Sequence, residues 1–166
     1  YDIGFQNLSR ALMSGMPIKV LVVDTQVYSN TGGQACTSGF IGQISDMAPF
    51  GAAQRGKQET RKEISLIGMA HRTSYVMSGT IAHTNHLIAS YIDGLNSRRP
   101  ALVNIYAVCP PEHGIGDDMS AHQARLAAES RAYPVFRYDP AAGKTPAECF
   151  DLAIEEDFVE EVARVR

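Results

Sequence analysis

Residues 18–34 read IKVLVVDTQVYSNTGGQ, an apolar run followed at once by a polar segment with two glycines. Residues 18–23 are β-branched or apolar except for one lysine, and the run ends at Asp24. An apolar run without polar alternation is typical of a strand buried on both faces of a parallel sheet. Residues 25–40 are rich in Ser, Asn, Thr and Gly and show no period, so we expect a loop at the carboxyl end of this strand.

Helical and strand patterns alternate along the rest of the chain. We expect helices at residues 2–13, 64–70, 84–95 and 119–132. We expect further strands at residues 74–77, 101–108 and 135–138. This alternation predicts an α/β fold, with a parallel sheet and helices on both of its faces. Ligands of such folds bind at the carboxyl ends of the strands, where residues 24–40 and 109–118 lie.

Two patterns give more specific expectations for packing. Helix 84–95 has an apolar face that we expect to meet the core, formed by Leu87, Ile88, Tyr91, Ile92 and Leu95. Residues 46–63 are mixed and polar, so we expect an exposed excursion there. Its basic residues are expected to form a solvated cluster of Arg55, Lys57, Arg61 and Lys62. The charged residues 155–166 are compatible with a helix.

The composition is that of a folded domain, with 166 residues of which 45% are hydrophobic and 20% charged. Fifteen basic and eighteen acidic residues give a net charge of -3, which argues against nucleic-acid binding. No apolar run approaches the roughly 18–20 residues that cross a bilayer. Three scattered cysteines are no disulfide framework, so we expect a reducing, cytoplasmic setting. The chain starts inside a helical pattern without an initiator Met, and we expect a piece of a longer protein.

The loop after Asp24 offers neutral oxygens and no positive charge. Thr25, Ser29 and Asn30 supply hydroxyl and amide oxygens, which Mg²⁺ accepts together with carboxylates and main-chain carbonyls. Gly32-Gly33 permits positive φ or the close approach of a ligand. Because the loop has no Lys or Arg and no Walker spacing, a diphosphate here would be held through a metal and main-chain amides. A solvated turn without a ligand is the alternative interpretation.

Residues 24–34, DTQVYSNTGGQ, resemble the thiamine diphosphate loop of the pyruvate:ferredoxin (flavodoxin) oxidoreductase family. Residues 1–5, YDIGF, resemble the family's preceding piece, which follows a Gly-Asp-Gly motif that this chain does not contain. LVNIYAVC at 102–109 and PVFRYDP at 134–140 resemble a later strand that ends in Cys and the closing strand. The resemblance implies that residues 1–140 are part of the thiamine diphosphate-binding domain without its N-terminal portion. Residues 141–166 are then a tail or linker.

The resemblance also implies roles for individual loop residues. The Thr25 side chain and the main-chain carbonyl of Val27 are the implied Mg²⁺ ligands, together with the Asp of Gly-Asp-Gly. The implied cofactor-binding residues are Thr25, Gln26, Val27, Tyr28, Ser29 and Asn30. Asn30 is the implied catalytic residue, because the family places it beside the thiazolium ring, where an amide can hydrogen-bond the substrate carbonyl or a developing oxyanion. Asp2 or Asp24 is the alternative source of the carboxylate oxygen.

Cys109 is implied to ligate a 4Fe-4S cluster whose other three cysteines come from earlier sequence. The alternative is a small buried hydrophobic side chain. Cys36 is the competing ligand because it is expected near the same sheet edge, and Cys149 is interpreted as a structural or free thiol. Glu112 and His113 lie beside Cys109 in sequence and are candidates for proton transfer or for tuning the cluster.

The implied parent enzyme oxidatively decarboxylates a 2-oxo acid, foremost pyruvate, using thiamine diphosphate, Mg²⁺ and 4Fe-4S clusters. Coenzyme A is the implied co-substrate and ferredoxin or flavodoxin the implied acceptor; we expect a homo-oligomer without nucleic-acid or membrane partners. Residues 35–37 and 110–118 depart from the family pattern, so a branch acting on oxalate, 2-oxoglutarate or an aryl pyruvate is an alternative. A non-catalytic α/β interaction domain is the alternative from another class. Alone, the chain is expected to be inactive, because one carboxylate ligand, three cluster cysteines and the facing domain come from elsewhere.

Overall fold

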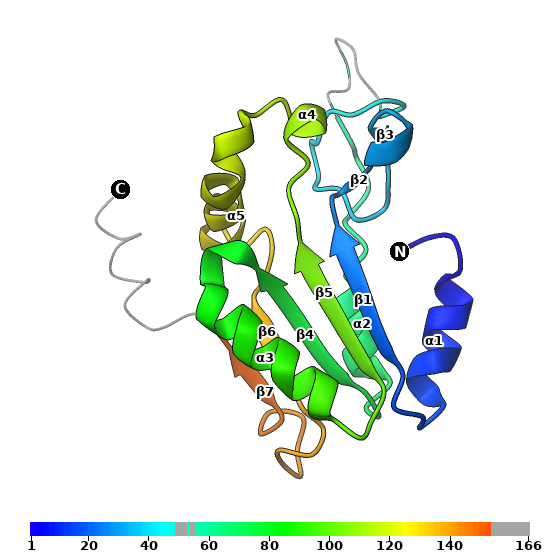
Figure 1. The fold of residues 1–166 in the computed structure, drawn as a ribbon. Coiled ribbons are helices and arrows are strands. Elements are labelled where there is room, and N and C mark those ends of the chain that lie inside the picture. The colour runs from blue at the N-terminus through cyan, green and yellow to red at the C-terminus, as the bar shows by residue number, and fades with distance from the viewer. Residues whose placement is uncertain (49–52, 54–55, 154–166) are drawn as a thin grey trace.

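The computed structural model describes residues 1–48, 53 and 56–153, and has a five-stranded sheet in the order β1-β5-β4-β6-β7 at its centre (Figure 1). The strands of this sheet are β1 (Lys19–Asp24), β4 (Tyr75–Thr80), β5 (Ala101–Tyr106), β6 (Phe136–Tyr138) and β7 (Phe150–Leu152). A separate antiparallel hairpin pairs β2 (Val27–Tyr28) with β3 (Gln34–Ala35). The helices are α1 (Phe5–Met13), α2 (Ile64–Ala70), α3 (Thr84–Asn96), α4 (Pro110–His113) and α5 (Ser120–Glu129). Three short 3-10 turns are η1 (Ser29–Thr31), η2 (Ile81–His83) and η3 (Asp117–Met119).

The predicted α/β fold is confirmed, with helices on both faces of the sheet. β1 and β4 flank β5 and pair with it in parallel. On one face, Leu12 of α1 and Ile64 of α2 pack in one apolar cluster with Leu102. On the other face, Leu87 of α3 packs in a cluster with Val103. Figure 1 shows α3 in front of the sheet and α2 behind it.

The last two strands add antiparallel pairs, so the sheet is mixed. β6 runs antiparallel to β4, and β7 runs antiparallel to β6. The local pattern predicted a strand at residues 135–138, but its direction depends on how the chain returns from α5. β7 lies in a segment for which no strand was predicted. The predicted tail helix, residues 155–166, lies outside the described residues.

The expectation that the first strand is buried on both faces is wrong for one of them. Val20 and Val22 of β1 pack against the apolar cluster that contains Leu12, Ile64 and Leu102. Leu21 and Val23 point to the opposite face and are 50% and 58% exposed. The reason is position: β1 is an edge strand, and α3 packs over β4 and β5.

Helix α3 also meets the sheet by a different face from the predicted one. Leu87 and Tyr91 pack inward as expected, but the most buried residues are Ser90 and Gly94. A Cβ atom on Gly94 would lie 3.0 Å from Cε1 of Tyr75, so small residues set the close approach of helix and sheet. The Tyr75 hydroxyl donates to the Ser90 carbonyl at 2.7 Å across the same contact. The remaining apolar residues of the predicted face are about half exposed: Ile88, Ile92 and Leu95.

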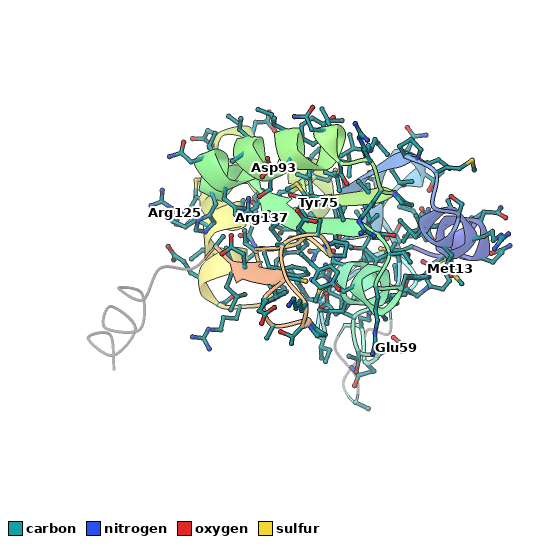
Figure 2. All side chains as sticks on the ribbon, turned by 90° about the horizontal axis from the view of Figure 1, so that it is seen from below. Met13, Glu59, Tyr75, Asp93, Arg125 and Arg137 are labelled. Atoms are coloured by element: carbon teal, nitrogen blue, oxygen red, sulfur yellow. The ribbon has the colours of Figure 1, made fainter. Side chains whose placement is uncertain are left out.

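The antiparallel edge is held by an apolar cluster inside and by an arginine outside. Phe136 is 1% exposed, and its ring centroid lies 5.0 Å from that of Phe150 on β7. On the surface, Arg137 donates to Asp93 of α3 at 2.8 Å and to Asp151 of β7 at 2.7 Å, and Figure 2 shows Asp93 and Arg137 close together. Both aspartate side chains are more than half exposed, so solvent weakens these ion pairs.

Packing, and not the surface ion pairs, is therefore expected to hold this edge. Phe136→Ala should lower the free energy of unfolding by about 3–5 kcal/mol, since it empties a buried aromatic site. Arg137→Ala should cost less than about 1 kcal/mol. Hydrogen exchange of the β4 and β6 amides in the full-length protein measures both changes. A loss from Arg137→Ala as large as that from Phe136→Ala would contradict this ranking.

Candidate functional site

The predicted site residues lie beyond the carboxyl ends of β1 and β5. The β2–β3 hairpin follows β1, α4 follows β5, and Figure 1 shows the two side by side at that end of the sheet. A cleft of about 240 Å³ borders the end of β1 and is lined in part by Thr25, Gln26, Val27, Tyr28 and Cys36. Four of the six predicted cofactor-binding residues therefore line one cleft.

The two predicted Mg²⁺ ligand atoms lie next to each other. The Thr25 Oγ1 atom is 2.9 Å from the main-chain oxygen of Val27, and Ser29 Oγ lies 3.4 Å from Thr25 Oγ1. Neighbouring ligands of an octahedral Mg²⁺ with bonds of about 2.0–2.1 Å are about 2.9 Å apart. Without a metal, the Thr25 hydroxyl donates a hydrogen bond to the Val27 carbonyl across this distance. The same spacing is compatible with two neighbouring Mg²⁺ ligands, so these residues fit the metal.

Gln26 turns the chain sharply after β1. It adopts φ 63°, a left-handed conformation that costs a non-glycine residue about 1–2 kcal/mol. Its amide donates to Asp24 Oδ1 at 3.0 Å, and its carbonyl accepts from Gln43 Nε2 at 3.0 Å. Among the described residues, both polar atoms of its buried side chain have no hydrogen-bond partner. The main chain of Gln26, and not its side chain, is what the surrounding protein fixes.

Asn30 lies in the 3-10 turn η1, between Ser29 and Thr31. It is exposed, and its side-chain amide makes no hydrogen bond to the described part of the chain. An amide in that state can be a donor or an acceptor for a ligand.

The two glycines of the loop have the conformations that the sequence indicated. Gly32 and Gly33 have φ values of 107° and 78°. Gly33 is also a point of close approach, because a Cβ atom there would lie 2.0 Å from Oε2 of Glu112. The close neighbour is the carboxylate end of Glu112 in α4, which a side chain at Gly33 would have to displace.

α4 connects the predicted cluster ligand to the cofactor loop. Cys109 directly precedes α4, is partly buried, and forms no disulfide. His113 at the end of α4 places Nε2 2.9 Å from the Thr25 carbonyl oxygen. Through His113 and Glu112, the segment that carries Cys109 rests directly on the predicted thiamine loop.

The other two cysteines differ in their surroundings. Cys36 borders the cleft, and its sulfur lies 3.0 Å from Ser38 Oγ. Cys149 is buried, and its sulfur lies 3.5 Å from the Gly143 carbonyl oxygen. Within residues 1–48, 53 and 56–153, no three His, Cys, Asp or Glu side chains are grouped as metal ligands. Within the same residues, no helix is long and apolar enough to cross a membrane.

Both candidate carboxylates are occupied by protein groups. Asp2 accepts from Lys62 Nζ at 2.8 Å, from the Tyr28 hydroxyl at 2.9 Å and from Thr37. Although burial acts in the opposite direction, these hydrogen bonds hold the pKa of Asp2 well below its usual range. Asp24 is 2% exposed and is paired with Arg61.

The predicted solvated basic cluster is wrong for two of its members. Arg61 is 8% exposed and Lys57 is 6% exposed. The Lys57 ammonium donates to the carbonyls of Gly39, Glu59 and Thr37 at 2.9, 3.2 and 3.4 Å. Arg55 lies outside the described residues. A charge-rich stretch usually predicts an exposed surface. The burial of Arg61 and Lys57 depends on their partners, a carboxylate and main-chain carbonyls that mostly lie far away in sequence.

Similar proteins show the family to which the chain belongs. No protein-family profile matches the chain. The chain is 37% identical over 150 residues to the pyruvate:ferredoxin oxidoreductase of Moorella thermoacetica, an alignment that covers 88% of it. It is 34% identical over 152 residues, again 88% of its length, to the pyruvate-flavodoxin oxidoreductase of Klebsiella pneumoniae. The chain belongs to the pyruvate:ferredoxin (flavodoxin) oxidoreductase family.

The chain is a small part of these oxidoreductases, since it spans 12% of the length of both relatives. A pyruvate dehydrogenase (NADP+) of Cryptosporidium parvum is 34% identical over 151 residues, which cover 87% of this chain and 7% of that protein. The 2-oxoglutarate:ferredoxin oxidoreductase of Magnetococcus marinus, solved with 2-oxoglutarate, coenzyme A and succinyl-CoA, has the same fold. The TM-score is 0.58 at 17% identity, and the match covers 66% of this chain and 36% of that one.

The contact between Gly33 and Glu112 gives a test with a matched control. Gly33 and Gly42 have left-handed φ values of 78° and 81°, but a Cβ atom on Gly42 would meet no neighbour among the described residues. Both alanine variants should lose roughly 1–2 kcal/mol for the backbone conformation. Only Gly33→Ala should also displace Glu112 and speed hydrogen exchange in residues 110–115 of the full-length protein. Glu112→Ala in the Gly33→Ala background should remove that second effect; equal exchange in both single variants would contradict it.

Proposed function

We propose that this chain is the thiamine diphosphate-binding segment of an enzyme that oxidatively decarboxylates pyruvate to acetyl-CoA and carbon dioxide. One observation carries the proposal: in a chain 37% identical to a pyruvate:ferredoxin oxidoreductase, Thr25 Oγ1 and Val27 O lie 2.9 Å apart at the carboxyl end of a strand. Residues 1–140 would form the cofactor-binding part. Because β7 (Phe150–Leu152) belongs to the same sheet, the tail or linker expected at residues 141–166 would begin only after β7. The enzyme works in the cytoplasm, as a homo-oligomer.

Thr25 and Val27 would bind the Mg²⁺ ion of the cofactor through one hydroxyl and one carbonyl oxygen. The main chain of residues 26–30 would surround the diphosphate. The Gln26 amide already donates to Asp24 Oδ1, so Tyr28 and Ser29 would contribute the amides and Ser29 also a hydroxyl. A further carboxylate ligand comes from outside the chain, because Asp2 and Asp24 are already hydrogen-bonded within it. Thiamine diphosphate, when bound, supplies a carbanion that attacks the 2-oxo carbon and accepts the electrons left after decarboxylation.

Asn30 acts at the reacting centre. Its exposed amide would donate a hydrogen bond to the substrate carbonyl oxygen, which gains negative charge as the carbon is attacked. The turn η1 fixes the main chain at Asn30, and its side-chain amide stays available to the substrate because no described protein group takes it.

Cys109 would ligate a 4Fe-4S cluster that receives the electrons. Its place supports this role, because α4 begins directly after Cys109 and contacts the Thr25 carbonyl through His113. The cluster and the thiamine loop are then parts of one packed unit, which suits rapid electron transfer.

This segment does not by itself select the electron acceptor. Relatives named for ferredoxin, for flavodoxin and for NADP+ all match nearly the whole of it at 34–37% identity. What these enzymes share is the oxidation of pyruvate, so the segment is assigned to that step. Ferredoxin or flavodoxin is the proposed acceptor, and coenzyme A the proposed co-substrate.

Two substitutions in the full-length enzyme should separate cofactor binding from turnover. Thr25→Val keeps the side-chain shape but removes the hydroxyl, and should weaken Mg²⁺-dependent binding of thiamine diphosphate by about 10–100-fold. Asn30→Ala should leave binding nearly unchanged and lower kcat by about 10²–10³-fold, because the donor acts in the transition state. Cofactor titration and steady-state kinetics measure both. Unchanged binding and turnover in the two variants would favour a non-catalytic interaction domain.

The cluster assignment is tested by changing each cysteine to serine in the full-length enzyme. Cys109→Ser should remove one cluster, measured as iron content and as the paramagnetic spectrum of the reduced protein. Cys36→Ser is the matched control and should keep every cluster, because Cys36 follows β3 and its sulfur lies beside Ser38, outside the α4 segment that carries Cys109. Loss of a cluster from Cys36→Ser alone would move the ligand to Cys36.

A further inference from the structure

A buried ion pair lies directly beneath the thiamine loop. Asp24, the last residue of β1, and Arg61 approach to 3.2 Å between Oδ2 and Nη2. Their side chains are 1% and 6% exposed. The pair joins residues 37 positions apart, and neither partner is part of the proposed binding or catalytic machinery.

The two oxygens of the Asp24 carboxylate have different partners. Oδ1 accepts the Gln26 amide at 3.0 Å, which closes the turn that leads into Thr25 and Val27. Oδ2 accepts the Tyr1 hydroxyl at 2.7 Å as well as Arg61. A carboxylate that is this buried needs a positive partner to stay charged. Arg61 and Tyr1 together hold Oδ2, which fixes the carboxylate so that Oδ1 faces the amide of the left-handed Gln26.

Arg61 itself is anchored from several sides. Its Nη1 atom donates to the Ala132 carbonyl at 3.2 Å and lies 3.4 Å from Glu63 Oε1. Its guanidinium carbon lies 4.6 Å from the ring centroid of Tyr133 and 5.6 Å from that of Phe40. Burial acts to lower the pKa of Arg61, but the charges of Asp24 and Glu63 outweigh it and raise that pKa. Arg61 is thus a fixed, charged contact between the core and the loop.

We propose that Arg61 is a positioning residue for cofactor binding. Acting through Asp24 and the Gln26 amide, it holds Thr25 Oγ1 and Val27 O at the spacing that a divalent cation with a diphosphate requires. This role rests on the proposed function for its ligand, but the effect of Arg61 on the loop is a property of the protein without ligand.

The test compares Arg61→Met with Arg137→Met in the full-length protein. Both changes remove an arginine that bridges two elements, but Arg137 contacts Asp93 and Asp151 at the far edge of the sheet. Without cofactor, Arg61→Met should raise the hydrogen-exchange rate of residues 25–30 by about tenfold, and Arg137→Met should leave it unchanged. With Mg²⁺, the apparent Kd for thiamine diphosphate should rise by about 10–100-fold for Arg61→Met only. Turnover at saturating cofactor should change much less, because bound cofactor selects the ordered loop.

A second change separates this role from simple packing against Tyr133. Arg61→Met leaves the Asp24 charge buried and unpaired. Asp24→Asn in that background removes the charge but keeps an oxygen that can accept the Gln26 amide. The double variant should therefore recover much of the slow exchange and of the cofactor affinity. Arg61→Lys, which keeps the charge and loses the planar fork, should fall between Arg61→Met and the unaltered protein.

The outcomes are distinct. Unchanged exchange in residues 25–30 of Arg61→Met, or no recovery in the double variant, would overturn the positioning role and leave Arg61 as core packing. A different result is that no variant binds thiamine diphosphate but hydrogen exchange follows the expected pattern. It would support the control of the loop by Arg61 and would overturn the proposed function.

Discussion

A carboxylate buried at the end of a strand needs a positive partner and satisfied hydrogen bonds, and Asp24 finds them in two residues that are distant in sequence and in one neighbour. Arg61 supplies the charge, Tyr1 a hydroxyl and Gln26 a main-chain amide. Asn104 of β5 donates to the Tyr1 hydroxyl at 2.9 Å, which ties the same network to the neighbouring strand. The path of the chain after β1 depends on this cluster, which holds the Gln26 amide, and on Gln43, whose side-chain amide donates to the Gln26 carbonyl.

The cluster lets a loop of neutral residues present oxygens in a fixed arrangement. The turn at Gln26 brings Thr25 and Val27 together, and His113 contacts the Thr25 carbonyl oxygen. Glu112 fills the space that the missing side chain of Gly33 leaves. The loop and α4 consequently form one packed surface at the carboxyl end of β1 and β5. That is where open α/β sheets bind ligands.

Relatives named for ferredoxin, for flavodoxin and for NADP+ all contain a segment similar to this chain. The structure agrees with a role of this segment that does not depend on the electron acceptor. Two features of the site stand out in the fold. One is the close pair of Thr25 Oγ1 and Val27 O, and the other is the contact between the predicted thiamine loop and α4. In the proposed function, both would serve the oxidation of the 2-oxo acid. The departures from the family pattern, residues 35–37 and 110–118, lie around this core and leave the spacing of Thr25 and Val27 intact.

The sequence by itself determined the features that depend on neighbouring residues. The apolar run of β1, helix α2 with its bounds, the left-handed Gly32-Gly33 and the loop at the sheet edge are all written in local patterns. Only the tertiary structure decided which face of α3 is buried, that Leu21 and Val23 stay exposed, and that β6 runs antiparallel. It also decided that Arg61 is buried, since a charged residue in a polar stretch gives no local sign of a partner 37 positions away. Periodicity reports a residue's own segment, whereas burial of a charge depends on which distant segment folds against it.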